Sequence, residues 1–304
     1  MKKRLLVNLF LSLFLLPVIL ELLALGGAYQ ASPSASLIRL CFEKNIAQED
    51  FVEFIDVGQG DSVLIKSGNA TALIDFGVKD DGTKIQRHLR RMGIKKLDFA
   101  VITHHHSDHM GGFLRVVEKI KIEKLIINNS TAEDGEKELY NEIIKMAKAQ
   151  KIKLILPKTG QSFKIGNASL KILRCDSSAD KENNRSIISK LDINGKRFLF
   201  TGDCDGDTEN RLMQGTDVKC DVLKMGHHGS STSSDSEFLS FVQPEIAIAS
   251  CGYDNIYNHP SENALLRFNE LSIRIYRTDL DGDIRFVFEN AQNNFKVLTE
   301  RKAA

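Results

Sequence analysis

The sequence predicts an α+β protein in which two β-sheets pack against each other and helices cover their outer faces. Short apolar segments typical of strands recur along the chain, and segments with helical periodicity lie between them. Both halves of the chain run from strands into helices, which suggests two packed sheets with helices outside. The 304 residues suit one large domain or two small ones.

The first 28 residues differ in character from the rest of the chain. Basic residues at 2–4 precede an apolar run at 5–25, and small residues follow at 26–28. This order is typical of an export signal, and a run of this length can also remain in the bilayer as a single anchor. We expect residues 1–28 to be a signal peptide or N-terminal membrane anchor, and the protein to be extracellular or at the cell surface.

The composition gives no global attraction for nucleic acid. The formal charge is +1, and residues 1–28 hold three basic residues and one acidic residue, so the remainder carries −1. Binding to phosphate backbones would therefore need a local patch. The five cysteines are an odd number without a C-x-x-C pair, which excludes a complete disulfide framework.

The expected strands are apolar or β-branched segments bounded by turn residues. Residues 29–48 lack periodicity and read as a linker. A glycine-rich turn at 58–60 separates the first two strands, and Asn194-Gly195 is a favoured hairpin turn in the second half. In chain order the expected strands are 51–57, 62–65, 71–76, 97–103, 125–127, 186–193, 196–201, 222–225, 246–250, 273–276 and 284–288.

The expected helices show apolar residues at helical spacing. In the first helix Ile85, Leu89 and Met92 form one face. Thr83 can cap its start and Gly93 can end it. In chain order the expected helices are 83–92, 113–120, 137–150, 208–213, 234–242 and 264–270. His88, near the apolar face of the first helix, is expected to be structural.

Four of the eight histidines lie within six residues, directly after an expected strand. So many ionisable side chains are costly to bury unless they bind something, and imidazole with carboxylate suits Zn²⁺, Mn²⁺ or iron. On an extended backbone His104 and His106 point to one side and His105 to the other. Asp108 and His109 begin the next turn and can address a second ion. A histidine-rich surface loop is the alternative interpretation.

Two further strand ends carry candidate ligands. Two metal ions need a shared anion, and Asp203 follows the strand at 196–201, where loops carry active sites; capping the next helix is its alternative role. His227 and His228 follow the strand at 222–225. Neighbours on a strand face opposite sides, so one is expected to bind metal and the other a substrate oxygen. The sequence leaves open which one does so.

These motifs resemble the metallo-β-lactamase superfamily, and the resemblance implies its four-layer αβ/βα sandwich and two divalent metal ions, with Zn²⁺ expected and Mn²⁺ the alternative. Asp75 resembles the acid of that family's first motif. Further segments resemble the hydrolase domain of ComEC-type DNA-uptake proteins, and the domain is expected at 49–300. These segments are Phe54–Ser62, Asn183–Ser186, Asp221–Lys224, Asn258–Pro260, Tyr276–Asp279 and Asp281-Gly282.

One departure from the family pattern concerns the first metal site. The usual third-motif histidine is absent, because the chain has none between His109 and His227. We expect His104, His106 and Asp203 to hold an ion weakly there, with water or Asn184 and Ser186 filling in. The second site has a full set of candidates in Asp108, His109, Asp203 and either His227 or His228.

The resemblance implies a metal-dependent phosphodiesterase or nuclease that uses a metal-activated water, and the N-terminal segment implies that it is exported. The alternatives are hydrolysis of a lactone, a thioester or a cell-surface phosphorylcholine ester, or a metal-stabilised module that binds DNA or a partner. The chain lacks the many membrane spans of an uptake channel and is expected to be the hydrolase domain exported by itself. The expected catalytic residues are Asp108, Asp203 and His259. The residues expected to support ligands or contact substrate are Asp75, Gln59, Asp61, Asn184, Ser186 and Lys224.

Overall fold

The structure is a computed structural model that describes residues 49–288 and 294–301. The signal or anchor expected at 1–28 and the linker expected at 29–48 lie outside the described residues. Among the residues described, none of the helices is long and apolar enough to span a membrane.

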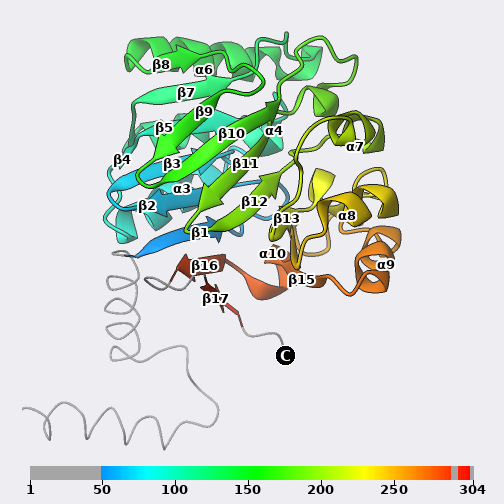
Figure 1. Cartoon of the computed structure of the whole chain (residues 1–304). Helices are drawn as coiled ribbons and strands as arrows, with labels where there is room; N and C mark the ends of the chain where they lie inside the picture. The colour runs from blue at the N-terminus through cyan, green and yellow to red at the C-terminus, as the bar shows by residue number, and fades with distance from the viewer. Residues whose placement is uncertain (1–48, 289–293, 302–304) are drawn as a thin grey trace, which may run out of the picture. The chain divides into compact units, whose positions relative to one another are not determined.

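The first sheet contains eight strands in the order β17-β16-β1-β2-β3-β5-β7-β8 (Figure 1). β1, β2 and β3 form an antiparallel meander, joined by residues 55–62 and by the tight turn at 68–69. β3, β5, β7 and β8 run parallel, because longer connections cross between them. The strands are β1 Asp50–Phe54, β2 Val63–Ser67, β3 Ala70–Ile74, β5 Phe99–Ile102, β7 Lys124–Ile127, β8 Lys153–Ile155, β16 Ile284–Phe288 and β17 Phe295–Thr299.

The second sheet contains seven strands in the order β15-β14-β13-β12-β11-β10-β9. The hairpin between β11 and β12 turns at Asn194 and Gly195, both with positive φ, as the favoured turn dipeptide predicts. The strands are β9 Ser162–Ile165, β10 Ala168–Arg174, β11 Ile188–Ile193, β12 Lys196–Phe200, β13 Val222–Lys224, β14 Ile246–Ala249 and β15 Arg274–Arg277. A small third sheet pairs β4 Lys96–Leu97 with β6 Lys121–Ile122.

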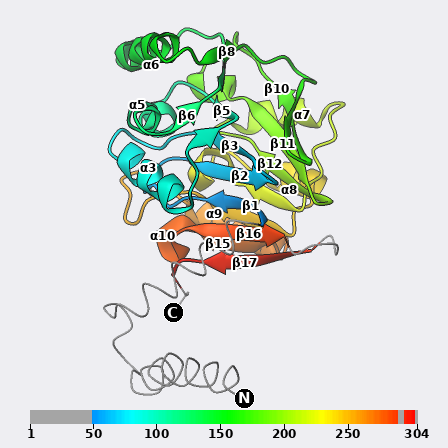
Figure 2. The same ribbon diagram turned by 90° about the vertical axis from the view of Figure 1, so that its left-hand side faces the viewer.

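Helices cover the outer faces of the two large sheets (Figure 2). α3, α5 and α6 lie on the first sheet, and α7, α8 and α9 on the second, as the labels in the same figure show. The helices are α3 Asp81–Arg91, α4 Ser107–Met110, α5 Phe113–Val117, α6 Lys137–Ala149, α7 Gly206–Met213, α8 Ser236–Val242, α9 Glu262–Glu270 and α10 Thr278–Asp281. Short 3-10 turns are η1 Asp134–Glu136, η2 Glu182–Arg185 and η3 Gly226–Gly229.

Apolar side chains form three cores, one between each pair of adjacent layers. Because neighbouring residues of a strand point to opposite faces, Phe51 packs under the helices of the first sheet and Val52 packs between the sheets. In the second sheet Phe198 faces the space between the sheets and Leu199 faces α7–α9. The layers are helix, sheet, sheet and helix, which confirms the α+β class and the four-layer αβ/βα sandwich.

Several elements differ from the expected ones. Four strands of the two large sheets, namely β8, β9, β10 and β17, were not predicted from the sequence. In β10, serine and lysine alternate with the buried Leu170 and Ile172, which is a period-two signal without a continuous apolar run. The strand expected at 97–103 is divided in two, because Asp98 exchanges backbone and side-chain hydrogen bonds with Thr71. Helix α3 begins at Asp81, ahead of the cap expected at Thr83.

Candidate metal centre

The candidate site lies where three strands end. The loop after β5 carries the histidine cluster and leads into α4, which begins at Ser107. Asp203 follows β12, and His228 lies in η3 directly after β13. The two sheets thus contribute ligands from opposite sides of the same edge.

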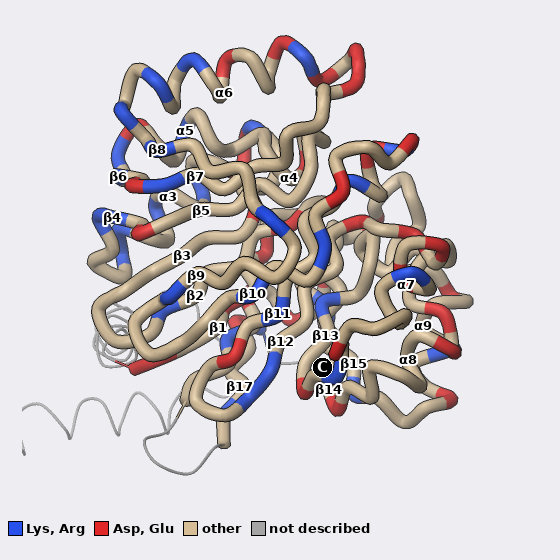
Figure 3. The backbone as a smooth tube through the Cα atoms, turned by 45° about the horizontal axis from the view of Figure 1, so that its top comes forward, with Lys and Arg blue, Asp and Glu red and all other residues tan. Residues whose placement is uncertain are grey.

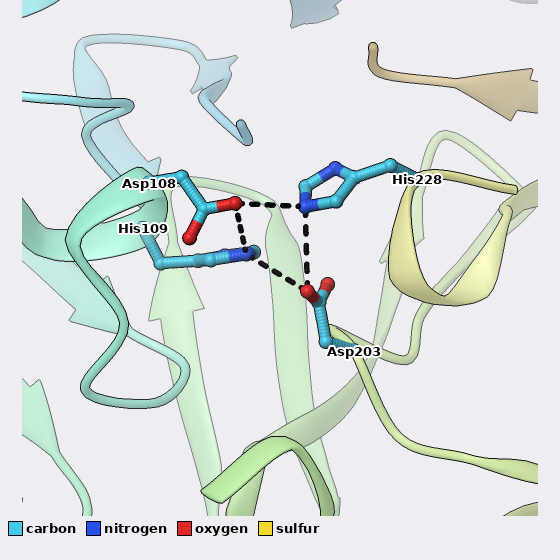
Figure 4. A group of neighbouring side chains, drawn as sticks. All are labelled: Asp108, His109, Asp203 and His228. Carbon is cyan, nitrogen blue, oxygen red and sulfur yellow. Dashed lines mark ion pairs between the residues drawn. The ribbon is translucent and has the colours of Figure 1, made fainter. Parts of the chain in front are cut away.

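Four side chains converge at this edge and form a tetrad, which we define as Asp108, His109, Asp203 and His228 (Figure 4). One ligand atom of each lies within 4.8 Å of the others. Oδ2 of Asp203 is 3.3 Å from Nε2 of His109 and 3.3 Å from Nε2 of His228. Oδ2 of Asp108 lies 3.2 Å from Nε2 of His228 and 3.9 Å from Nε2 of His109.

The donor atoms of the tetrad fit a divalent metal ion. Nε2 of His109, Nε2 of His228 and Oδ1 of Asp203 are buried and have no hydrogen-bond partner. Buried polar atoms without a partner are rare in proteins, and an ion is one of the few explanations for three in one place. Imidazole and carboxylate are also the ligands that zinc and manganese accept.

The remaining ring nitrogens of the two tetrad histidines are fixed from behind. Nδ1 of His109 donates to Asp75 at 2.9 Å, and Nδ1 of His228 donates to the Ser250 carbonyl at 2.9 Å. Asp75 also accepts hydrogen bonds from the backbone and hydroxyl of Thr103. Such partners orient metal-binding imidazoles and leave the Nε2 lone pair free for an ion.

A buried ion pair supports the tetrad on its other side. Nζ of Lys224 lies 2.8 Å from Asp61, and Asp61 lies 3.4 Å from Nδ1 of His228. Burial alone would raise the pKa of Asp61, but the Lys224 ammonium, followed by His228 and His109, lowers it to about 2. Burial would lower the pKa of Lys224, and Asp61 above all raises it. Both groups are therefore charged at pH 7, and the ammonium offsets part of the negative charge around the site.

Without metal, the tetrad histidines hold protons. Burial by itself would lower the pKa of His109 and of His228, but the neighbouring carboxylates, Asp203 first, raise both pKa values well above the ordinary range. Burial would raise the pKa of Asp203, and the two histidines hold it well below its usual value. Because a ligand imidazole must be neutral, an arriving ion has to displace these protons.

The first metal site is less complete. Nε2 of His104 lies 3.1 Å from Nδ1 of His106 and 3.9 Å from Oδ2 of Asp203. Burial and the nearby His109 lower the pKa of His104 well below its usual value, so this imidazole is neutral and competent to bind metal. The structure thus brings two histidines and the shared Asp203 together.

Asn184 and Ser186, expected either to fill the first site or to support its ligands, contact the loop after β12. Ser186 Oγ accepts the Asp203 N–H at 3.0 Å and lies 3.3 Å from Nδ1 of His104, the ring nitrogen other than the one near Asp203. Asn184 donates to the Asp205 carboxylate and accepts the Asp205 N–H. Both side chains hold the loop after β12, so they are not directed at open coordination positions in this structure.

His105 faces away from the tetrad, as the alternation predicts. Its backbone N–H donates to Glu182 at 2.8 Å, and Glu182 is paired with Arg185 at 2.9 Å. Arg185 in turn donates to the carbonyls of Thr131 and Ala179. Segment η2 thereby ties the histidine loop to its surroundings. No local pattern in the sequence indicates this role of Glu182.

The side chains of His227 and His228 occupy different positions, but not because they alternate along a strand. Both have left-handed backbone conformations, with φ of 48° and 56°, so strand alternation does not apply to them. His228 joins the tetrad, whereas Nε2 of His227 lies 3.8 Å from Asp203. The His227 ring packs at 5.3 Å against the ring of His259.

The last two expected residues border the site. Nδ1 of His259 is buried without a hydrogen-bond partner. Burial, followed by the charges of His227 and His228, lowers the pKa of His259 to about 4, so its ring is neutral at pH 7. Gln59 Oε1 accepts the backbone N–H of Gly252 at 3.2 Å and joins two loops beside the site.

The four-layer sandwich, together with a histidine and aspartate centre at its edge, defines the metallo-β-lactamase class of proteins. The family model described as Metallo-beta-lactamase superfamily matches residues 55–166. The chain belongs to this superfamily, whose fold typically binds two metal ions, and it is similar to ComEC-type competence proteins.

Two curated relatives illustrate the similarity. ComE operon protein 3 of Bacillus subtilis (strain 168) is 29% identical over 272 residues, which cover 83% of this chain and 35% of that protein. Competence protein ComA of Neisseria gonorrhoeae is 34% identical over 235 residues, which cover 76% of this chain and 31% of that protein. The chain therefore spans about a third of the length of these relatives.

Solved structures share the fold at low sequence identity. CmlA, a diiron beta-hydroxylase from Streptomyces venezuelae, has a TM-score of 0.52 and 14% identity, over 79% of this chain and 54% of that one. The metallo-beta-lactamase fold protein YhfI from Bacillus subtilis has a TM-score of 0.51 and 12% identity, over 75% of this chain and 96% of that one. At these identities the likeness concerns the fold alone.

Proposed function

We propose that this chain is a metal-dependent phosphodiesterase whose substrate is DNA or another nucleic acid. The observation that carries the proposal is the tetrad, where donor atoms of Asp108, His109, Asp203 and His228 converge. Buried atoms of His109, Asp203 and His228 have no hydrogen-bond partner there. The similarity to competence proteins favours a nucleic-acid substrate. We further propose that Zn²⁺, or alternatively Mn²⁺, occupies two positions that share Asp203.

The ions supply two things when bound: they neutralise phosphate oxygens, and they lower the pKa of water to near neutrality. The tetrad would hold one ion, and His104 and His106 with Asp203 would hold the other. Asp108 is 26% exposed, the most accessible of the four tetrad side chains, so its carboxylate is available to orient an incoming water. Lys224 and Asp75 keep the ligands in place from behind.

His259 is the candidate for contact with the scissile phosphate. Its ring is neutral at pH 7 and its Nδ1 has no partner in the protein. A neutral imidazole stabilises a developing charge by donating an N–H hydrogen bond, and a phosphate nearby would favour its protonated form for transfer to the leaving oxygen. This refines the expected role of His259, since the free protein does not present it as a cation.

Location is a separate proposal. We propose that residues 1–28 export or anchor the chain, so that the domain acts outside the cytoplasm. Fractionation of cells that express the full chain tests this: recovery in the extracellular or membrane fraction supports it, and recovery in the cytoplasmic fraction contradicts it.

A metal-reconstituted substrate panel tests the activity. The full chain is stripped of metal, supplied with Zn²⁺ or Mn²⁺, and assayed on bis(p-nitrophenyl) phosphate, single- and double-stranded DNA, and a lactone. Metal-dependent cleavage of the phosphodiesters supports the proposal. Hydrolysis of the lactone without any phosphodiester cleavage overturns it, as does DNA binding without turnover under every metal condition.

A further inference from the structure

We propose that residues 252–260, here called the tyrosine loop, form a platform on which an unpaired nucleobase stacks, so that single-stranded DNA is held by its bases beside the metal centre. This inference rests on the proposed function and specifies the form of its substrate. Three features carry it: exposed apolar side chains, a rigid backbone, and continuity with the site.

The tyrosine loop concentrates exposed apolar surface. Eight large apolar side chains are exposed in the described part of the chain, and three of them, Tyr253, Ile256 and Tyr257, lie within five residues. They are 78%, 88% and 59% exposed. Single exposed apolar residues are ordinary on protein surfaces, but a group of them beside a site indicates a binding surface.

The backbone that presents these side chains is fixed by one residue. Asn255 Oδ1 accepts the backbone N–H groups of Tyr257 and His259 at 3.2 and 3.0 Å. Asn255 Nδ2 donates to the carbonyls of Gly252 and His259. A loop ordered before binding loses little conformational entropy when a ligand arrives, so its exposed rings are prepared for contact.

Both ends of the tyrosine loop attach to segments that bear the site. Gly252 donates to Gln59, two residues before Asp61, and Ser261 donates to the carbonyl of Gly229, next to His228. The separation between loop and metal centre is therefore set by direct hydrogen bonds.

A line of rings leads from the metal centre to the surface. The ring of His227 lies 5.3 Å from that of His259, and His259 stacks with Tyr257 at 5.9 Å and an interplanar angle of 27°. At the inner end, Nε2 of His227 lies 3.8 Å from Asp203. A flat ligand that stacks on Tyr257 would extend this line of rings, which begins beside the metal ligand Asp203.

The charge of the tyrosine loop decides among aromatic-binding ligands. Residues 252–260 contain no lysine or arginine and one acid, Asp254, and around both sheets basic and acidic residues are mixed (Figure 3). Attraction for phosphate alone is therefore weak here, whereas stacking of a neutral base needs no positive charge. In a duplex the bases are already stacked and paired, so the platform selects single strands.

The test separates bases from backbone. The full chain is titrated, in EDTA to prevent hydrolysis, with a fluorescent oligothymidylate and with an abasic oligomer of the same length and charge. We expect the wild type to prefer the base-bearing oligomer by roughly 5- to 100-fold. We expect Tyr257→Ala to bring this ratio close to one and Tyr257→Phe to preserve most of it. Phe241→Ala, which removes a 49% exposed ring from α8, is the matched control and should keep the wild-type ratio.

Three outcomes overturn the inference: equal affinity of the wild type for both oligomers, an unchanged ratio in Tyr257→Ala, or a Tyr257→Ala effect confined to binding of phosphatidylglycerol vesicles. Cleavage of the same two oligomers with metal restored keeps the proposed function separate. Base-dependent binding without cleavage overturns the proposed function and supports the platform. Equal cleavage and equal binding of both oligomers supports the proposed function and overturns the platform.

Discussion

In the described part of the chain, the tetrad and a separate cluster of histidine and carboxylate that shares no residue with it differ in what satisfies their donor atoms. The tetrad leaves three buried donor atoms without partners. The second cluster, Glu53, His88 and Asp283, brings its ligand atoms equally close, within 4.8 Å. There, however, Glu53 accepts hydrogen bonds from Arg285 at 2.6 and 3.0 Å and contacts Nε2 of His88 at 2.8 Å.

The comparison teaches that proximity of metal-binding residue types does not by itself make a metal site. In the second cluster the Arg285 guanidinium is the balancing cation. Burial would raise the pKa of Glu53, but His88 and then Arg285 lower it to about 2. Asp283 is also occupied, because it accepts the backbone N–H of Asp56 at 2.8 Å. A built-in cation thus satisfies one cluster, whereas buried donor atoms of the tetrad have no partner within the protein.

The largest effect is expected from a substitution of Asp203, the anion that the two proposed metal positions share. Asp203→Asn keeps the shape of the side chain but removes the charge that both metal positions share. We expect hydrolysis of bis(p-nitrophenyl) phosphate to fall by more than about 100-fold, together with loss of bound metal measured by mass spectrometry after gel filtration. Retention of two ions per chain by this variant would contradict the assignment.

The matched change in the second cluster should affect folding and not metal. Glu53→Gln leaves Arg285 without its buried counter-charge, and removal of one partner of a buried ion pair costs about 3 kcal/mol. Urea denaturation should show this loss in the free energy of unfolding, whereas metal content should equal that of the wild type. A drop in bound metal would show that the second cluster also binds an ion.

Within the metal centre, the two positions should bind ions with different affinity. The tetrad offers four ligand residues, whereas the other position has three, namely His104, His106 and the shared Asp203. We therefore expect the two metal dissociation constants to differ by at least about tenfold. Competition titration with a chelating dye measures both. His106→Ala should remove only the weaker ion and His228→Ala the tighter one; two equal, tight sites would sink the prediction.

The smallest effect concerns the pH dependence of the second cluster. Burial would lower the pKa of His88, but Glu53 above all raises it, so the folded value exceeds the unfolded 6.5. Protonated His88 therefore adds stability that is fully present below pH 6.5 and is lost as pH rises through the folded pKa. Between pH 6 and 9 the wild type should lose about 1 kcal/mol more than His88→Gln, measured by urea denaturation in EDTA. Equal losses of unfolding free energy in the wild type and in His88→Gln would show that protonation of His88 does not stabilise this cluster.

Much of the fold and site could be predicted where the signal is local. The strands at β1 and β16 and the long helix α6 follow from short-range patterns in the sequence. The histidine cluster could also be recognised from the sequence, because its candidate ligands lie within six consecutive residues. The strands β9 and β10 were missed because polar residues alternate with apolar ones in them, so neither contains a continuous apolar run.

The sequence by itself determined the two-sheet class, the superfamily and the metal-binding character of the histidine loop, because each depends on residues close together in the chain. Only the tertiary structure decided that His228 joins the tetrad while His227 faces His259, since left-handed backbone at both residues overrides strand alternation. It also decided that the cluster of His88 is already neutralised, because Glu53 and Arg285 meet across 232 positions of sequence. Ligand spacing is local, whereas the charge that competes with a metal ion comes from wherever the fold brings it.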